Sequence, residues 1–270
     1  ELLAGSFGGI NLEDISAPRC FEIEKRLKKD LDIPVFHDDQ HGTAVVTAAA
    51  LLNALKIVGK KIEDINVVIN GAGAAGLAIA KFLLRFGVKD VIVCDSKGIL
   101  CKGDSRLNGA KQEVAEMSNK RRVVGSLAAA MKGADVFVGV SVANCVSEEM
   151  VRSMAEKAIV FACANPTPEI SREKALAAGA AVVGTGSSEY PNQINNVLVF
   201  PGLFRGALDV RAKDINMEMM MAAAQGIAFC VSETQLNPDY ILPYAYDPKA
   251  HEAVAKAVAQ AARDTGVARE

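Results

Sequence analysis

The chain has 270 residues, a length that can bury a sizeable core and that fits one large domain, or one domain with an additional part. Half of the residues are hydrophobic, only 5% are aromatic and none is tryptophan, a composition typical of parallel sheets covered by helices. The net charge is -2 and the charged residues are scattered along the chain, so we expect no basic face that would bind DNA or RNA.

The distribution of cysteines and apolar residues argues against a secreted or membrane-bound protein. The six cysteines show no CxxC spacing and stand mostly among apolar residues, which is typical of reduced thiols in the cytoplasm. The longest apolar stretch, residues 44–58, is shorter than a membrane span and contains Asn53 and Lys56. We recognise no secretory signal and expect that processing or truncation removed what preceded Glu1. A cytoplasmic protein without membrane contact is expected.

The first predicted elements are a helix, a short strand and a second helix. Apolar residues recur every four positions among Glu and Lys at Ile23, Leu27 and Leu31. This period predicts an amphipathic helix that ends before Pro34, followed by a strand over residues 35–37. Residues 44–58 are apolar on nearly every face, and Gly59 can cap them in the left-handed conformation. We therefore expect a central helix that is packed on both sides and joins two parts of the molecule.

From residue 67 onward, predicted strands alternate with predicted helices. The strands are expected at residues 67–70, 91–94, 136–140, 159–162 and 181–183. The helices between and after them are expected at residues 74–86, 107–117, 147–154 and 171–178. Such alternation requires right-handed crossovers and predicts an α/β fold with a doubly wound, parallel, Rossmann-type sheet flanked by helices. After Pro201 we expect only helices, at residues 203–210, 215–231 and 251–262.

The loop after the first of these strands has the pattern of a dinucleotide-binding turn. It fits G-x-G-x-x-G and consists of Gly71, Ala72, Gly73, Ala74, Ala75 and Gly76. An apolar strand precedes it, a helix follows, and Asp95 ends the next strand about 20 residues later, as the pattern requires. The helix N-terminus would hold the pyrophosphate of NAD or NADP. The alternative is a Gly-rich turn that binds no ligand.

The residues around Asp95 leave the choice between NAD and NADP open. An acid at this position can bond both ribose hydroxyls, which favours NAD. Ser96, Lys97, Arg106 and Lys111 are nevertheless close enough in sequence to receive the 2′-phosphate of NADP. We therefore expect Asp95 and Ser96 to contact the adenosine ribose of either cofactor.

Two acidic pairs, Glu13-Asp14 and Asp38-Asp39, precede the dinucleotide turn. Neither stands on the polar side of an evident amphipathic helix, and each is flanked by apolar residues, so we expect partly buried carboxylates. Four such charges would repel one another unless a cation or a base compensates them, and Mg²⁺ or Mn²⁺ prefers oxygen ligands of this kind. Alternatively, each pair consists of solvated loop or capping acids. His37 and His41, four residues apart, are either a metal pair or structural histidines.

Four segments of the sequence resemble the malic enzymes, particularly the shorter bacterial type. They are SFGGINLEDI (6–15), IPVFHDDQHGTA (33–44), ANPTPE (164–169) and NNVLVFPG (195–202). The likeness extends from Ser6 to about Ala262, and the four motifs occur in the family's order.

The resemblance implies roles for particular residues. The implied ligands of the divalent metal are Glu13, Asp14 and Asp39. Asp38 would belong to the catalytic set by holding the catalytic lysine in an ion pair. Asn165 and Asn196 would bind the substrate, with Asn165 also contacting the cofactor where the carboxylate of the substrate meets the nicotinamide ribose. The alternative for each asparagine is a turn residue, above all for Asn165 before Pro166.

One feature of the family is absent from this sequence. In the family a tyrosine and a lysine from a preceding domain act as general acid and general base, and no residue here matches their motifs. The tyrosines at 190, 240 and 244 lie in other parts of the chain, and Lys25 and Lys28 lie on a solvated helix face. We therefore divide the chain into residues 1–42, a remnant of a substrate and metal domain; residues 43–212, the NAD(P)-binding Rossmann-type domain; and residues 213–270, C-terminal helices that pack back on the first segment.

The implied function is oxidative decarboxylation of malate to pyruvate and CO₂, with reduction of NAD or NADP in a homo-oligomer. A base would take the proton of the C2 hydroxyl as hydride passes to the nicotinamide, and Mg²⁺ or Mn²⁺ would act as a Lewis acid. A second hypothesis is a fragment that binds cofactor and partner without turnover, because the acid and base are missing. A third is a metal-independent amino or hydroxy acid dehydrogenase, which would leave the acidic pairs without a role.

Overall fold

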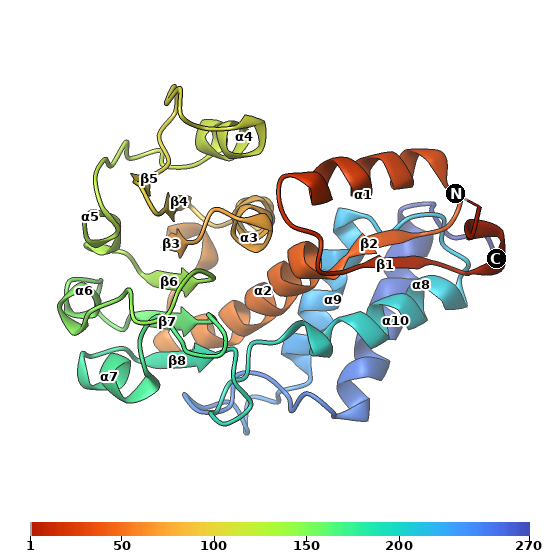
Figure 1. Ribbon diagram of the computed structural model, residues 1–270. Coiled ribbons are helices and arrows are strands. Elements are labelled where there is room, and N and C mark those ends of the chain that lie inside the picture. The colour runs from red at the N-terminus through yellow and green to blue at the C-terminus, as the bar shows by residue number, and fades with distance from the viewer. Residues whose placement is uncertain (1) are drawn as a thin grey trace.

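A computed structural model describes residues 2–270, and one half of the molecule is built on a six-stranded sheet (Figure 1). The strands lie in the order β5 (Gly98–Ile99), β4 (Asp90–Asp95), β3 (Asn66–Asn70), β6 (Val136–Gly139), β7 (Ile159–Ala162) and β8 (Val182–Thr185). The chain moves outward from β3 to β4 and then returns to the other side of β3 for β6. Loops after β3 and β6 therefore diverge at the carboxyl edge, which is where such sheets bind ligands.

The edge strand β5 differs from the expected all-parallel sheet. It pairs with β4 in the antiparallel direction, with Cys94 opposite Ile99 and Asp95 opposite Gly98. A tight turn joins the two strands, and Gly98 adopts a φ of 112° that only glycine takes readily. A strand of two residues is too short to show alternation, so the sequence pattern did not predict it.

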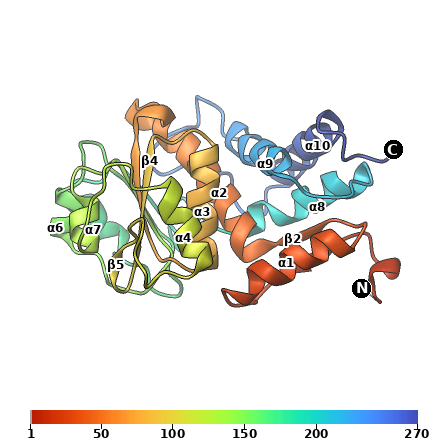
Figure 2. The same ribbon diagram turned by 90° about the horizontal axis from the view of Figure 1, so that it is seen from above.

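Helices cover both faces of the sheet, as predicted for a doubly wound fold (Figure 2). One face packs against α2 (Asp38–Val58), α3 (Ala74–Arg85) and α4 (Gly109–Met117), and the other against α5 (Leu127–Met131), α6 (Glu148–Arg152) and α7 (Arg172–Ala177). Successive strand residues alternate between the two cores: Val67 and Ile69 face α2 and α3, whereas Val68 faces the opposite layer. The five-residue helix α5 was not predicted because it is too short to show a helical period.

The central helix α2 begins at Asp38, six residues before the predicted start. The sequence pattern did not predict a helix over these six residues, because they include Gly42 and glycine is in general unfavourable inside a helix. Here a Cβ at Gly42 would lie 1.9 Å from Oδ1 of Asp38 and 3.0 Å from Cβ of Asn196, so the position requires glycine. The helix is long and apolar enough to cross a membrane, yet 72% of its most apolar part is buried inside the molecule. It is an interior helix with the sheet on one side and other helices on the other.

The chain before α2 forms a small parallel sheet that was only half predicted. The strand β1 (Ile10–Leu12) pairs with β2 (Val35–His37), and α1 (Arg19–Asp30) connects them. Only β2 had been expected, since three residues of β1 give no recognisable alternation. In the register of this pair Leu12 is opposite His37, so the residues that follow each strand are neighbours.

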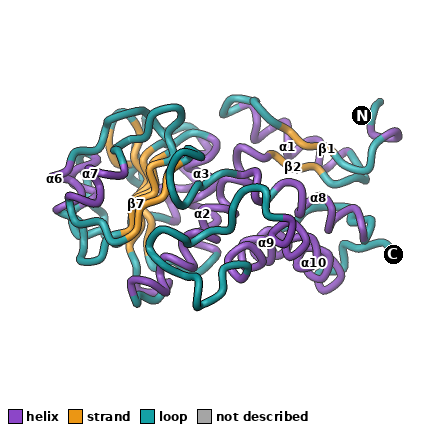
Figure 3. Tube along the Cα trace, turned by 90° about the horizontal axis from the view of Figure 1, so that it is seen from below, coloured by secondary structure: helices purple, strands orange, loops and turns teal. Residues whose placement is uncertain are grey.

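The last part of the chain is helical, as predicted (Figure 3). It consists of α8 (Phe200–Asp209), α9 (Met217–Phe229) and α10 (Pro248–Asp264). These helices begin at capping residues or at a proline, so their bounds differ from the predicted ones by a few residues. The Phe204 ring of α8 meets the Phe36 ring of β2 edge-on, with 6.1 Å between the ring centres. Thus α8 contacts the first segment, while the division of the chain into three domains, with residues 213–270 packing back on that segment, remains a prediction.

Candidate functional site

The dinucleotide turn joins β3 to α3 with the geometry that a phosphate site needs. Gly71 has a φ of 122°, and a Cβ there would lie 2.4 Å from the carbonyl oxygen of Val140. A Cβ at Gly76 would lie 1.7 Å from the carbonyl oxygen of Gly71, so the third glycine allows helix and turn to pack closely. Gly73 faces open space, and no side chain caps α3. The first amides of α3 are therefore free to bind an anion.

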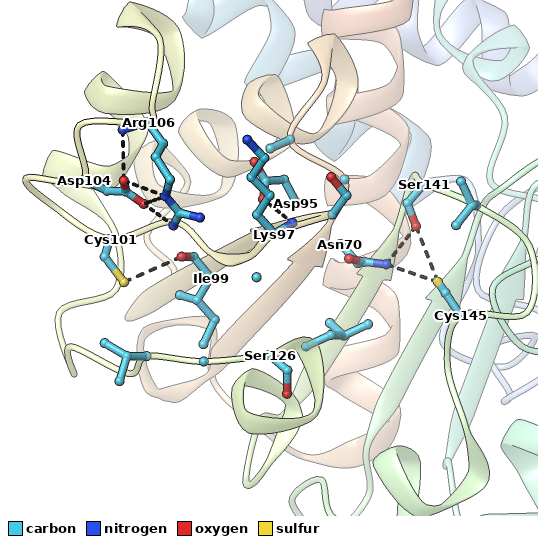
Figure 4. Close-up of a pocket in the computed structure, with 18 of the residues that line it drawn as sticks. Asn70, Asp95, Lys97, Ile99, Cys101, Asp104, Arg106, Ser126, Ser141 and Cys145 are labelled. Atoms are coloured by element: carbon cyan, nitrogen blue, oxygen red, sulfur yellow. Dashed lines mark hydrogen bonds and ion pairs between the residues drawn. The ribbon is translucent and has the colours of Figure 1, made fainter.

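A pocket of about 930 Å³ extends from this turn along the carboxyl edge of the sheet (Figure 4). Gly71 and Ala72 of the turn line it, as do Asp95 and Ser96 at the end of β4. Ser141, in the loop after β6, lies on the opposite side. The pocket thus occupies the divergence between β3, β4 and β6, where dinucleotides bind in folds of this type.

The carboxylate of Asp95 is held in its ionised form at the end of β4. Its Oδ2 lies 2.6 Å from Nζ of Lys111, and its Oδ1 accepts a hydrogen bond of 2.9 Å from the amide of Lys97. Burial opposes ionisation, but the bonds from Lys111 and Lys97 and the charge of Arg106 together lower the pKa of Asp95. Arg106 itself binds Asp104 through Nε at 2.9 and 3.0 Å. Two of the basic side chains near the ribose position are therefore already paired with acids.

The structure brings the two acidic pairs together. Because Leu12 and His37 are opposite each other in the small sheet, Glu13-Asp14 follows β1 directly beside Asp38-Asp39 at the start of α2. The amide of Asp14 donates a hydrogen bond of 2.9 Å to Oδ2 of Asp39. The prediction of partial burial is wrong for Glu13 and Asp14, which are exposed because the chain turns outward at Asp14, where φ is 58°.

Asp38 is the buried member of the four acids, with 5% of its surface exposed. Its Oδ2 accepts a hydrogen bond of 2.8 Å from Nδ2 of Asn196, while its buried Oδ1 has no partner among residues 2–270. Burial, together with the charges of Glu13 and Asp39, raises the pKa of Asp38 to about 7. A cation placed at this carboxylate would remove the penalty that burial imposes on its charge.

The acidic residues fit a divalent cation in chemistry but do not enclose one. Within residues 2–270 no three His, Cys, Asp or Glu side chains are close enough together to form a preformed metal cluster. The oxygen donors of Glu13, Asp14 and Asp39 are nevertheless of the type that Mg²⁺ and Mn²⁺ prefer. The alternative histidine pair is not supported, because Nε2 of His41 binds Oε1 of Glu24 at 2.8 Å. His37 is fully buried, and burial lowers its pKa.

A second pocket, of about 310 Å³, lies between Asp39, which alone of the four acids lines it, and the dinucleotide turn. Asp39 and Thr43 line one side and Ala75 of the turn lines another. Both predicted asparagines, Asn165 and Asn196, contribute to it, although they are 31 positions apart in the chain and come from different loops. We call this the reaction pocket, because it is where groups suited to the metal, the substrate and the cofactor meet.

Sequence reasoning missed several residues that line the reaction pocket. Ser141, Cys163 and Asn195 belong to it, and none was assigned a role beforehand. Only Asn195 had a recognisable signal, as the neighbour of Asn196 in a quoted motif; in the structure its side chain caps the short 3-10 helix Asn196–Leu198. Ser141 and Cys163 follow strands without a distinctive pattern, so their place emerges only once the sheet is assembled.

Comparison with known proteins decides the family. A family model for the NAD-binding domain of malic enzyme matches residues 40–263. This chain belongs to the malic enzyme family. It is 59% identical over 270 residues to the bifunctional malic/malolactic enzyme of Bacillus subtilis (strain 168), and 57% identical over 270 residues to the NAD-dependent malic enzyme of Geobacillus stearothermophilus. Relatives named NADP-dependent malic enzymes match as well.

Solved structures agree with this assignment. The malic enzyme of Pyrococcus horikoshii superimposes with a TM-score of 0.95 at 45% identity, covering 99% of this chain and 64% of that one. The two sequence matches cover the whole of this chain, but only 66% of the length of the Bacillus relative and 56% of the length of the Geobacillus relative. The predicted family resemblance and the predicted Rossmann-type fold are therefore confirmed.

Proposed function

We propose that this chain contributes the cofactor site and the metal carboxylates to an enzyme that oxidatively decarboxylates malate to pyruvate and CO₂. The observation that carries the proposal is the reaction pocket, in which Asp39, Asn165 and Asn196 meet Ala75 of the dinucleotide turn. Family membership supports malate as the substrate and NAD or NADP as the hydride acceptor.

Each part of the site has a task in this reaction. The free amides at the start of α3 bind the pyrophosphate, and Asp95 accepts hydrogen bonds from the adenosine ribose. Asn165 and Asn196 orient the substrate carboxylate and the nicotinamide ribose, so that C2 of malate faces the nicotinamide. Glu13, Asp14 and Asp39 would hold Mg²⁺ or Mn²⁺. When bound there, the ion would act as a Lewis acid toward malate.

Asp38 would orient a base rather than act as one. Its Oδ2 is engaged by Asn196, and its buried Oδ1 has no hydrogen-bond partner within residues 2–270. An ammonium group at this oxygen would satisfy the buried charge and would itself be fixed in place. We therefore assign Asp38 the task of holding the lysine that the family uses as its base.

A second candidate function is cofactor binding without turnover by this chain alone. The residues that line the reaction pocket include no tyrosine and no lysine that could transfer a proton to or from malate. Loss of a positioned acid or base typically lowers the rate by about 100 to 10,000-fold. The pocket thus supports binding more directly than it supports a complete reaction.

Two measurements test these functions. The 270-residue chain is assayed for pyruvate with malate, Mn²⁺ and each cofactor, and its NADH affinity is measured in parallel. Pyruvate production refutes the binding-only function, whereas NADH binding without turnover supports it. Activity that persists in excess chelator would favour a metal-independent dehydrogenase instead.

Substitution of a proposed metal ligand tests the metal site. In the full-length protein, D39A should abolish Mn²⁺-dependent turnover and weaken Mn²⁺ binding measured by calorimetry, because it removes a ligand carboxylate. D32A is the matched control, since the Asp32 carboxylate is fully exposed and lies outside both pockets. Normal Mn²⁺ binding by D39A would rule out Asp39 as a ligand.

A further inference from the structure

A buried carboxylate that the proposed reaction does not use lies behind the wall of the reaction pocket. Glu169 follows β7 and is completely inaccessible to solvent. Its carboxylate packs over Gly139 at the end of β6, where a Cβ would lie 2.3 Å from Cδ of Glu169. An acid so deeply buried is costly unless every oxygen has a partner, so the contacts of this side chain indicate its role.

The partners of Glu169 belong to two different loops. Its Oε1 accepts hydrogen bonds from the amide and from the hydroxyl of Ser141, at 2.8 and 3.2 Å. Its Oε2 accepts a hydrogen bond of 3.0 Å from the amide of Ala164. One carboxylate therefore fixes the loop after β6 relative to the loop after β7.

The network continues to the dinucleotide turn. Nδ2 of Asn70, the last residue of β3, donates a hydrogen bond of 2.8 Å to Oγ of Ser141, which in turn donates to Glu169. Figure 4 shows Asn70, Ser141 and Cys145 facing one another on one side of the cofactor pocket. The carboxyl ends of β3, β6 and β7 are thus joined through a single buried acid.

The residues held by this network are those that line the reaction pocket. Ser141 and Ala164 are both in its wall, and Ala164 precedes Asn165. We propose that Glu169 is a positioning residue for the nicotinamide end of the cofactor: from inside the fold it holds the two loops between which the nicotinamide must lie. This inference rests on the proposed function, because it assumes that the dinucleotide extends from the turn into the reaction pocket.

A general contribution to folding predicts a different result from a positioning role. If Glu169 only stabilises the fold, its replacement affects every part of a bound dinucleotide equally or not at all. If it positions the nicotinamide, its replacement weakens ligands that carry the nicotinamide more than ligands that lack it. NADH and ADP-ribose differ by this group alone, so the ratio of their affinities separates the two cases.

The experiment compares the two ligands on two variants. E169Q keeps the shape of the side chain but presents an NH₂ group to an amide donor, so the loops lose one of their anchors. We expect E169Q to weaken NADH binding relative to ADP-ribose binding by about tenfold, the change expected when one hydrogen bond to a charged group is lost. D90N is the matched control: Asp90 is 2% exposed and also accepts backbone amides, but it begins β4 at the opposite edge of the sheet.

The outcomes separate this inference from the proposed function. An unchanged affinity ratio in E169Q, or an equal change in D90N, overturns the positioning role. Failure of the unaltered chain to bind either ligand overturns the proposed function and this inference with it. If E169Q does not fold, NMR of the unaltered chain decides: the amide resonance of Ala164, which lines the reaction pocket but not the large cofactor pocket, should shift with NADH but not with ADP-ribose, and equal shifts with both ligands contradict the proposal.

Discussion

At the residue scale, Asp95 combines two requirements of a ribose site. An ionised carboxylate accepts stronger hydrogen bonds from ribose hydroxyls than a neutral one, yet a bare negative charge would repel the 2′-phosphate of NADP. Lys111, 2.6 Å away, meets both requirements, because it lowers the pKa of Asp95 and compensates its charge. The balance between this lysine and this acid therefore influences how well each cofactor binds.

Replacement of Lys111 should shift the balance toward NAD. In K111A the charge of Asp95 is no longer compensated, so we expect NADPH to lose about fivefold more affinity than NADH, the equivalent of about 1 kcal/mol for a partly exposed charge pair. Fluorescence titration of the chain with both nucleotides measures the effect. K81A is the control, because Lys81 forms a comparable ion pair with Glu113 outside the cofactor pocket. Equal losses for both nucleotides would show that Lys111 does not influence the choice.

At the element scale, an acid on α1 anchors that helix to the start of α2. Glu24 is 8% exposed, and its two oxygens bind Nε2 of His41 at 2.8 Å and Nε2 of Gln40 at 3.3 Å. Burial raises the pKa of Glu24, but the bond and the charge of His41, with Lys28 and His37 adding, lower it overall. The ionised carboxylate is therefore favoured in the folded state.

The pH dependence of stability should report this contact. Because the folded pKa of Glu24 lies below its unfolded value, its contribution is complete above the ordinary pKa of glutamate and is lost as the pH falls through the folded value. We expect E24Q to be less stable than the unaltered chain by about 1 to 3 kcal/mol at neutral pH, and the difference to vanish in acid. Urea unfolding at several pH values measures it, with the exposed E22Q as control. A difference that persists in acid would contradict this assignment.

The elements that could be predicted from the sequence are those long enough to show a period. The strands β3, β4, β6, β7 and β8 were expected close to their observed bounds because each contains a short apolar run, as buried parallel strands do, and α3 because its apolar residues recur with a helical period. The two-residue strand β5 and the five-residue helix α5 were not predicted, because they are too short to show a recognisable pattern. The early start of α2 was missed because Gly42 is explained only by its contacts with Asp38 and Asn196, which lie outside any local pattern.

The same limit applies to the site. The dinucleotide turn is contiguous in sequence and was found there, with Asp95 at the required spacing. The bond between Asp38 and Asn196 joins residues 158 positions apart, and Glu169 reaches Ser141 across 28. Such contacts follow from strand order and helix packing, so the sequence identified the acids and asparagines singly but not the pocket that they form.

At the scale of the whole molecule, α2 packs both against the layer that contains the cofactor-binding sheet and against the C-terminal helices. One of its faces packs against α3 beside the sheet, and the other against α9. In its middle, the completely buried Asn53 donates hydrogen bonds of 2.9 Å to the carbonyl oxygens of Ala228 and Ile241 in the C-terminal part. A helix shared in this way couples the cofactor-binding sheet to the C-terminal helices, so we expect the two to unfold as one unit.

The distribution of tyrosines makes this coupling measurable. The chain has four tyrosines and no tryptophan, and Tyr240, Tyr244 and Tyr246 all follow α9, so its intrinsic fluorescence mainly reports the C-terminal part. NADH binding reports the sheet. We expect both signals to disappear at one urea concentration. We expect N53L to lower that concentration for both together, because it removes the two hydrogen bonds that Asn53 donates to buried carbonyl oxygens, at a cost of about 2 kcal/mol or more. If tyrosine fluorescence changed in N53L while NADH still bound, α2 would not couple the halves, and the C-terminal helices would be an independent unit attached to a stable Rossmann-type core.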